Sequence, residues 1–182
     1  MPSPDVLDFA KLVAPLPGDK PTGADPRANT SPTSPYYKVK DARSAARSAE
    51  RLHALARTLP GKPLVIPTDV SDPAAIERLV KETVAALGTI DIVVQNAGVG
   101  LAAPVAELKA ETFQQALAVD VFGPLALTQA ALPHLRNGGG QIIFVSSVVG
   151  LRALPYLGGY AAAKAALDRL TEALRVELRG SG

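Results

Sequence analysis

Tyr160 and Lys164 are the residues whose types and spacing first indicate chemistry. They stand four positions apart in GGYAAAKAAL, so on a helix the phenol and the ammonium share one face. A nearby positive charge favours the tyrosinate form, which brings a phenol into a useful range for acid/base work. The bare spacing is weak support, because Tyr36 and Lys40 repeat it inside a proline-rich segment. The neighbouring elements must distinguish the two pairs.

Ser147 supplies that context. It follows an apolar, strand-like run, QIIFV (141–145), and precedes Tyr160 by thirteen residues. Open α/β sheets bind ligands at the carboxyl ends of their strands. A hydroxyl there can hydrogen-bond a carbonyl or alcohol oxygen while the phenol exchanges a proton with that oxygen. Tyr36 has Gly23 at the equivalent offset and no strand before it.

A second polar turn, QNAG (Gln95 to Gly98), ends another strand-like run. Its small residues would let a flat cofactor approach the backbone, and Asn96 can join neighbouring strands by hydrogen bonds. Gly98 also opens GVGLAA, which matches the G-x-G-x-x-A dinucleotide fingerprint. That fingerprint needs its last small residue inside a helix, and Pro104 favours a loop instead.

Strand-like and helix-like stretches alternate along most of the chain. The predicted strands are 64–70, 90–95 and 141–145. The predicted helices are 41–59, a helix that Asp72 caps and Gly88 ends, 111–135 with disturbances at Gly123-Pro124 and Pro133, and 159–178. The strands are apolar on both faces, which indicates an α/β fold with helices on the two sides of a parallel sheet. Eight of the sixteen prolines lie in the first 35 residues, where we expect irregular backbone.

Composition narrows the function classes. The 182 residues are 47% apolar and 20% charged, as expected for one soluble domain or one domain with an appendage. A net charge of +2 does not predict nucleic acid or a membrane as partner. The absence of cysteine excludes thiol nucleophiles and thiolate metal sites, and the two histidines form no metal motif. No signal peptide and no run of about 18 apolar residues is visible, so we expect a cytoplasmic protein.

Together these motifs resemble the classical short-chain dehydrogenase/reductase family over about residues 47–182. QNAG stands where that family has NNAG, FVSSVVG carries Ser147, and YAAAK carries Tyr160 and Lys164. The resemblance implies a Rossmann-type sheet, NAD or NADP as cofactor, and hydride transfer between nicotinamide and a carbonyl or alcohol. It makes Tyr160 the general acid/base and Lys164 the ligand of the nicotinamide ribose. It gives Ser147 the role of orienting the substrate oxygen.

The same resemblance implies a cofactor surface and a subunit interface. Its cofactor-binding residues would be Asp69 of TDV on the adenine side, together with Asn96, Ala97, Gly98, Tyr160 and Lys164. In the family, the helices that match 111–135 and 159–178 form the subunit interface. A homo-oligomer and a small-molecule substrate are therefore the expected partners.

Several departures from the family pattern bear on activity. Asp120 in LAVDVFG stands where the family has an asparagine of the proton relay, and an ionised carboxylate accepts hydrogen bonds but cannot donate them. Asp120 is kept as a catalytic candidate, with pairing to Lys164 as the alternative. No TGxxxGxG turn precedes Arg47, and the sequence stops at Gly182 before the family's last strands. We therefore expect an incomplete sheet, loss of the neighbour of strand 64–70, and impaired activity.

The first 51 residues resemble a different family, the N-terminal segment of ImpA-related type VI secretion proteins. The likeness rests on LVAPLPGDKPTGADPR (12–27) and SPYYKVKDARSAAR (34–47). It implies a structural or scaffolding role without catalysis. The predicted domains are 1–46, proline-rich and ImpA-like, and 47–182, a partial reductase domain. Two functions stay open: an NAD(P)-dependent oxidoreductase, or a non-catalytic interaction protein or fusion product linked to type VI secretion.

Overall fold

The computed structural model describes residues 43–44, 47–59, 63–135 and 139–180. Residues 1–42 lie outside this range, and with them the predicted irregular segment, the Tyr36 and Lys40 pair and most of the ImpA-like stretch. In the described part, helices alternate with strands and every strand pair is parallel. The α/β class, with a partial parallel sheet and flanking helices, is confirmed.

The first sheet is a parallel pair of two-residue strands, β1 (Arg43–Ser44) and β2 (Leu64–Val65). The expectation that the 64–70 strand loses its neighbour is therefore wrong, since β1 hydrogen-bonds to it. β2 is also shorter than predicted. Pro67 has no N–H with which to continue a ladder, so the chain leaves the sheet as it approaches this residue.

Helix α2 (Ala49–Thr58) is the remainder of the helix predicted over 41–59. The predicted helix is wrong at residues 43–44. These residues form β1, although good helix formers surround them. Pairing with a distant strand outweighs local helix propensity here, because propensity is a weak prior. Ser48 begins the helix by accepting the backbone N–H of Arg51.

Helix α3 (Pro73–Leu87) follows its sequence signals. Asp72 caps it by accepting a backbone N–H, and the proline occupies the first turn, where its missing donor costs nothing. Gly88 ends it with φ of 81°, a conformation that favours glycine. The buried cluster under α3 comprises Val80, Ile90 and Ala131.

The second sheet pairs β3 (Ile92–Gln95) with β4 (Gln141–Phe144) in parallel and in continuous register. A bridge between Ile90 and Leu135 precedes it, and the Val145 N–H extends it by donating to the Gln95 carbonyl at 2.9 Å. Both predicted strands are confirmed. Because the strands are parallel, their carboxyl ends meet at one edge of the sheet.

The helix predicted over 111–135 is present as one continuous helical stretch. Its segments are α4 (Ala110–Leu117), the π-helical η3 (Ala118–Phe122), α5 (Gly123–Ala131) and the 3₁₀ turn η4 (Leu132–His134). The predicted disturbance at Gly123 coincides with the change of helix type. A Cβ on Gly123 would lie 2.5 Å from the Val70 carbonyl oxygen, so this close approach requires glycine.

The same stretch, Ala110–His134, is long and apolar enough to cross a membrane by length and composition. One such helix is weak support for a span, because core helices pass the same test. Two of its polar side chains, Asp120 and Thr128, are buried. Thr128 accepts a hydrogen bond from the Gln95 side chain at 2.8 Å and donates one to the Pro124 carbonyl. These bonds are typical of a core helix.

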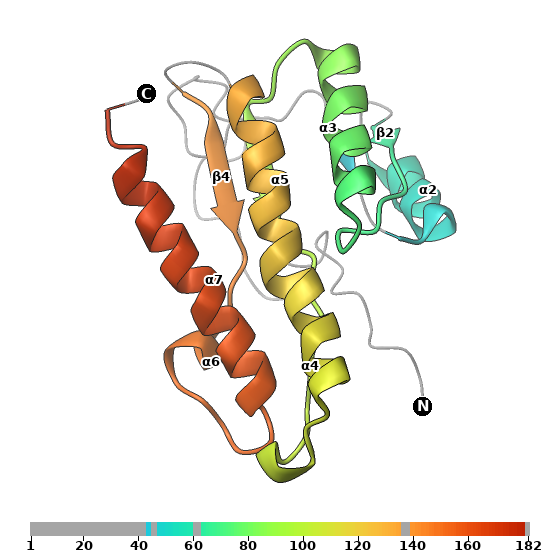
Figure 1. Ribbon diagram of the computed structural model, residues 1–182. Coiled ribbons are helices and arrows are strands. Elements are labelled where there is room, and N and C mark those ends of the chain that lie inside the picture. The colour runs from blue at the N-terminus through green and yellow to red at the C-terminus, as the bar shows by residue number, and fades with distance from the viewer. Residues whose placement is uncertain (1–42, 45–46, 60–62, 136–138, 181–182) are drawn as a thin grey trace, which may run out of the picture.

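Figure 1 shows α7 (Gly158–Glu177), the α4–α5 helix and α3 side by side, with β4 between α7 and α5. Gln95 faces this helix layer through its bond to α5. The opposite face of the second sheet carries Ile92, Val94 and Ile143, which are 40–46% exposed. Among the described residues no strand joins the two sheets, so the parallel sheet is in two pieces.

Candidate active site

Ser147 lies where β4 ends and the short helix α6 (Val148–Leu151) begins. Its backbone is extended, and its Oγ accepts the Val149 N–H at 3.4 Å, which makes Ser147 the N-cap of α6. A hydroxyl that accepts one bond keeps its own proton for donation to a ligand. The structure therefore places Ser147 at the carboxyl end of β4, as the sequence predicted.

Helix α7 carries both Tyr160 and Lys164 in its first two turns. Lys164 Nζ lies 5.6 Å from the centre of the Tyr160 ring, so the two side chains share one face. Lys164 is buried and Tyr160 is half-buried. The helix begins at a pair of glycines that pack against Val105, Leu101 and Leu108, which fixes its start against the loop that follows β3.

Lys164 binds two partners on neighbouring elements. Its Nζ forms an ion pair with Asp120 Oδ1 at 2.9 Å and donates to the Val145 carbonyl at 3.4 Å. The pair is almost completely shielded, with side-chain exposures of 4% for Lys164 and 0% for Asp120. The alternative that Asp120 pairs with Lys164 is therefore confirmed.

Asp120 belongs to the π-helical turn η3, which inserts it between α7 and the loop after β3. Its second oxygen, Oδ2, accepts the Val99 N–H at 3.0 Å. Isolated π-turns are frequent at functional sites. The carboxylate thus ties the loop after QNAG to the ammonium on α7.

The QNAG turn affects the site mainly through the room that its small residues leave beside the backbone, and less through its side chains. Gln95 turns into the helix layer, and the residues from Asn96 to Pro104 are not helical, which agrees with the loop interpretation of GVGLAA. A Cβ on Gly98 would lie 2.8 Å from Asp120 Oδ1 and 3.2 Å from Lys164 Nζ. Gly98 is therefore needed for the ion pair to close against the loop.

Replacing Gly98 by alanine is expected to lower the free energy of unfolding by about 1–3 kcal/mol, because the new methyl group overpacks the buried pair. Urea unfolding measures this. Gly100→Ala is the matched control, since nothing lies within 4 Å of a Cβ at that position. Equal losses in the two variants would contradict the steric account.

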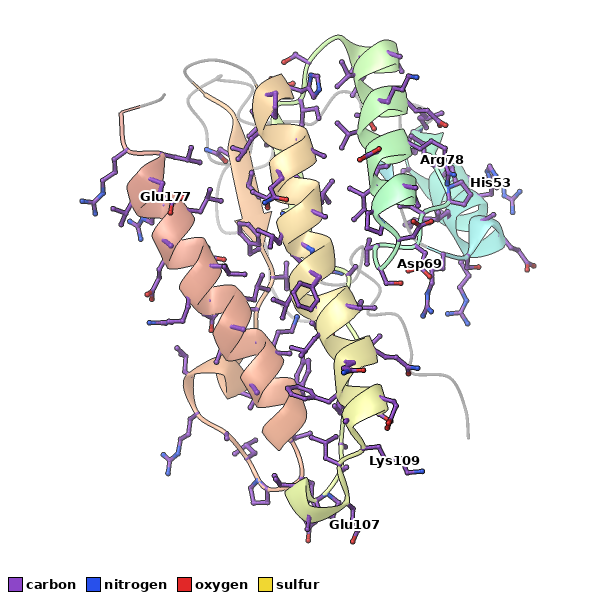
Figure 2. The ribbon with its side chains drawn as sticks, in the orientation of Figure 1. His53, Asp69, Arg78, Glu107, Lys109 and Glu177 are labelled. Carbon is purple, nitrogen blue, oxygen red and sulfur yellow. The ribbon has the colours of Figure 1, made fainter. Side chains whose placement is uncertain are left out.

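Asp69 lies outside this cluster, beside the start of α3, on the far side of α5 from α7 (Figure 2). Its Oδ1 accepts hydrogen bonds from the Ser71 hydroxyl at 2.7 Å and the Ser71 N–H at 2.9 Å. These bonds, with a smaller contribution from the charge of Arg47, hold the pKa of Asp69 below its ordinary value of 3.8. Asp69 therefore lies in a different part of the molecule from Ser147, Tyr160 and Lys164, the candidate reacting groups.

The lowered pKa of Asp69 predicts a pH-dependent contribution to stability. The unfolded chain binds this proton more tightly, so the stabilisation is present above pH 3.8 and is lost as the pH falls through the folded-state pKa. Ser71→Ala should therefore destabilise the protein at pH 7 and cost less near pH 3. Urea midpoints at the two pH values test this. The same cost at both would show that Asp69 ionisation is not involved.

Sequence reasoning missed three groups at the site. The Val99 N–H and the Val145 carbonyl hold Asp120 and Lys164, and backbone groups leave no signal in residue types. Ser146 Oγ is buried and has no hydrogen-bond partner among the described residues. In that same part of the chain no group of three or more metal-ligating side chains exists.

The family model described as short chain dehydrogenase matches residues 38–182. "Dehydrogenase/reductase SDR family member 7B" of Bos taurus is 32% identical over 142 residues, which cover 72% of this chain and 44% of that protein. "Meso-2,3-butanediol dehydrogenase" of Serratia marcescens is 35% identical over 134 residues, which cover 73% and 53%. The chain belongs to the short-chain dehydrogenase family.

A solved structure agrees with this assignment. The short chain dehydrogenase/reductase from Burkholderia phymatum in complex with NAD superposes with a TM-score of 0.74 at 29% identity, over 77% of this chain and 52% of that one. The fold is therefore the Rossmann type of that family. The chain spans about half the length of the relatives it matches.

Proposed function

We propose that this chain acts in an NAD(P)-dependent oxidoreductase that moves hydride between nicotinamide and a small carbonyl or alcohol substrate. The observation that carries the proposal is the placement of Ser147 at the end of β4, with Tyr160 and Lys164 on one face of α7. Open α/β sheets bind ligands at this edge.

The described residues fit the nicotinamide half of such a cofactor. Lys164 offers ammonium donors for ribose hydroxyls, and the glycine at position 98 leaves the adjacent loop without a side chain. We assign Asn96 and Ala97 to the same cofactor surface and propose Asp69 for the adenine side, as the family resemblance implies. NAD and NADP both remain candidates for this surface.

Two hydroxyl groups of this chain, those of Ser147 and Tyr160, have separate roles at the substrate oxygen. NAD or NADP held beside these residues would supply the hydride chemistry at the carbonyl carbon. Ser147 donates a hydrogen bond to the carbonyl oxygen and so orients it. Tyr160 gives its phenolic proton to that oxygen in reduction and takes it back in oxidation, and the Lys164 ammonium lies 5.6 Å from the centre of its ring.

Titration of the purified protein with NADH and with NADPH, followed by nicotinamide fluorescence, tests this function. Saturable micromolar binding with carbonyl-dependent oxidation of the cofactor would support it, and Tyr160→Phe should abolish the oxidation. A folded protein that binds neither cofactor would remove the enzyme function and favour the alternative, a non-catalytic interaction protein or fusion product linked to type VI secretion. That alternative rests on the resemblance of residues 1–51.

A homo-oligomer is part of the same proposal. The helices over 111–135 and 159–178 are its contact surfaces, and both carry exposed apolar side chains, including Phe122 at 59% and Val176 at 57% exposure. The substrate is a small molecule, and the site is expected to work in the cytoplasm. We also propose that residues 1–46 are a separate proline-rich domain.

A further inference from the structure

In this structure a buried carboxylate already balances the positive charge of Lys164. Its ammonium contacts the Asp120 carboxylate at 2.9 Å and the Val145 carbonyl at 3.4 Å, and the two charged side chains are 4% and 0% exposed. Buried opposite charges at this distance are screened little by solvent, so each cancels most of the field of the other. The pair presents almost no net charge to groups around it.

The carboxylate is held in this position from two sides. Oδ2 of Asp120 accepts the Val99 N–H, and the Gly98 Cα lies so close that a methyl group there would contact both members of the pair. The π-helical turn sets the side chain at this depth. Asp120 therefore cannot leave Lys164 without also releasing the loop after β3.

Tyr160 is the group that this arrangement affects. Its ring centre is 5.6 Å from Lys164 Nζ, and a positive charge at that distance would favour tyrosinate. Another charged group of α7 is Asp168, whose carboxylate lies against Gly150 of α6. The end of β4 adds the Val145 carbonyl and the hydroxyls of Ser146 and Ser147.

We propose that Asp120 is a positioning residue that suppresses proton transfer by Tyr160, because it pairs with Lys164 and cancels the charge that would stabilise tyrosinate. The inference rests on the proposed function for its consequence in turnover, but its effect on Tyr160 exists without cofactor. The neutral, nearly isosteric substitution Asp120→Asn leaves an acceptor for the Val99 N–H and restores the charge of Lys164. The substitution should therefore make the phenol of Tyr160 react faster with reagents that attack the phenolate form.

Nitration by tetranitromethane, which attacks the phenolate form of tyrosine, reads this effect in the cofactor-free protein. At fixed pH near neutrality, Tyr160 of Asp120→Asn should be nitrated about tenfold faster than Tyr160 of the wild type. Tyr156, which is 66% exposed, is the internal standard in the same peptide maps. Asp168→Asn is the matched control, because it removes a carboxylate from the same helix without touching the ion pair, and it should leave the rate unchanged.

Turnover provides the second measurement. In Asp120→Asn, kcat/KM for alcohol oxidation, in which Tyr160 acts as the base, should rise by about tenfold at neutral pH, and the acid limb of its pH profile should move to lower pH. Unchanged nitration of Tyr160 in a folded Asp120→Asn would overturn the inference. Faster nitration without NADH or NADPH binding would support the inference and contradict the proposed function, so the two failures are distinguishable.

Stability is checked by urea unfolding, because Asp120→Asn removes one member of a buried pair. If this variant does not fold, Asp120→Ser is the substitute, since its smaller side chain leaves room for water beside Lys164. The wild type gives a test that needs no variant. If wild-type Tyr160 is nitrated several times faster than Tyr156, Lys164 is not neutralised and the inference is wrong.

Discussion

Tyr160→Phe is expected to lower kcat/KM for carbonyl reduction by about 10²–10⁴-fold, the usual contribution of a positioned general acid. The substitution removes only the phenolic oxygen, to which none of the described residues is seen to hydrogen-bond. The ring keeps its place beside Lys164. The fold should therefore be unchanged while the proton donor is lost.

Steady-state oxidation of NADH with a panel of small carbonyl compounds measures the loss, and fluorescence titration measures the affinity. Tyr156→Phe is the matched control: the same atom is removed from an exposed tyrosine four residues earlier. A Tyr160→Phe protein with wild-type turnover would show that another group carries the proton. Equal losses in the two variants would point to a general effect on the loop before α7.

Elements whose ends depend on a few adjacent residues were predicted correctly from the sequence. Asp72, Pro73 and Gly88 mark the two ends of α3 through a cap, a fixed φ and a left-handed residue, and each of these depends on a few adjacent positions. A similar reason made the positions of Ser147, Tyr160 and Lys164 predictable, because a strand end and a helical repeat determine where each side chain lies.

Contacts between distant segments were harder to predict. β1 is two residues long, and its neighbours favour a helix, so only its pairing with β2 reveals it. Asp120 was a candidate partner of Lys164 because it stands where the family pattern has the relay asparagine and because it carries a negative charge. The attachment of its second oxygen to Val99 depends on a π-turn, which has no residue signature.

Lys164→Met is expected to lower the free energy of unfolding by about 3–5 kcal/mol, because it leaves the completely buried Asp120 carboxylate without its counter-charge. Methionine fills similar volume, so the loss should come from charge and not from a cavity. Urea unfolding with an unchanged m-value would show that two-state behaviour is kept.

The double variant Lys164→Met/Asp120→Asn separates the value of the pair from the cost of breaking it. A neutral amide still accepts the Val99 N–H, and no unpaired charge stays buried, so stability should recover most of the loss of the single variant. If the double variant is instead as unstable as Lys164→Met, the pair contributes by hydrogen bonds of Lys164, such as that to Val145, and not by charge. Recovery of stability with no recovery of turnover would mean that Lys164 is retained for chemistry, because the fold alone does not require its charge.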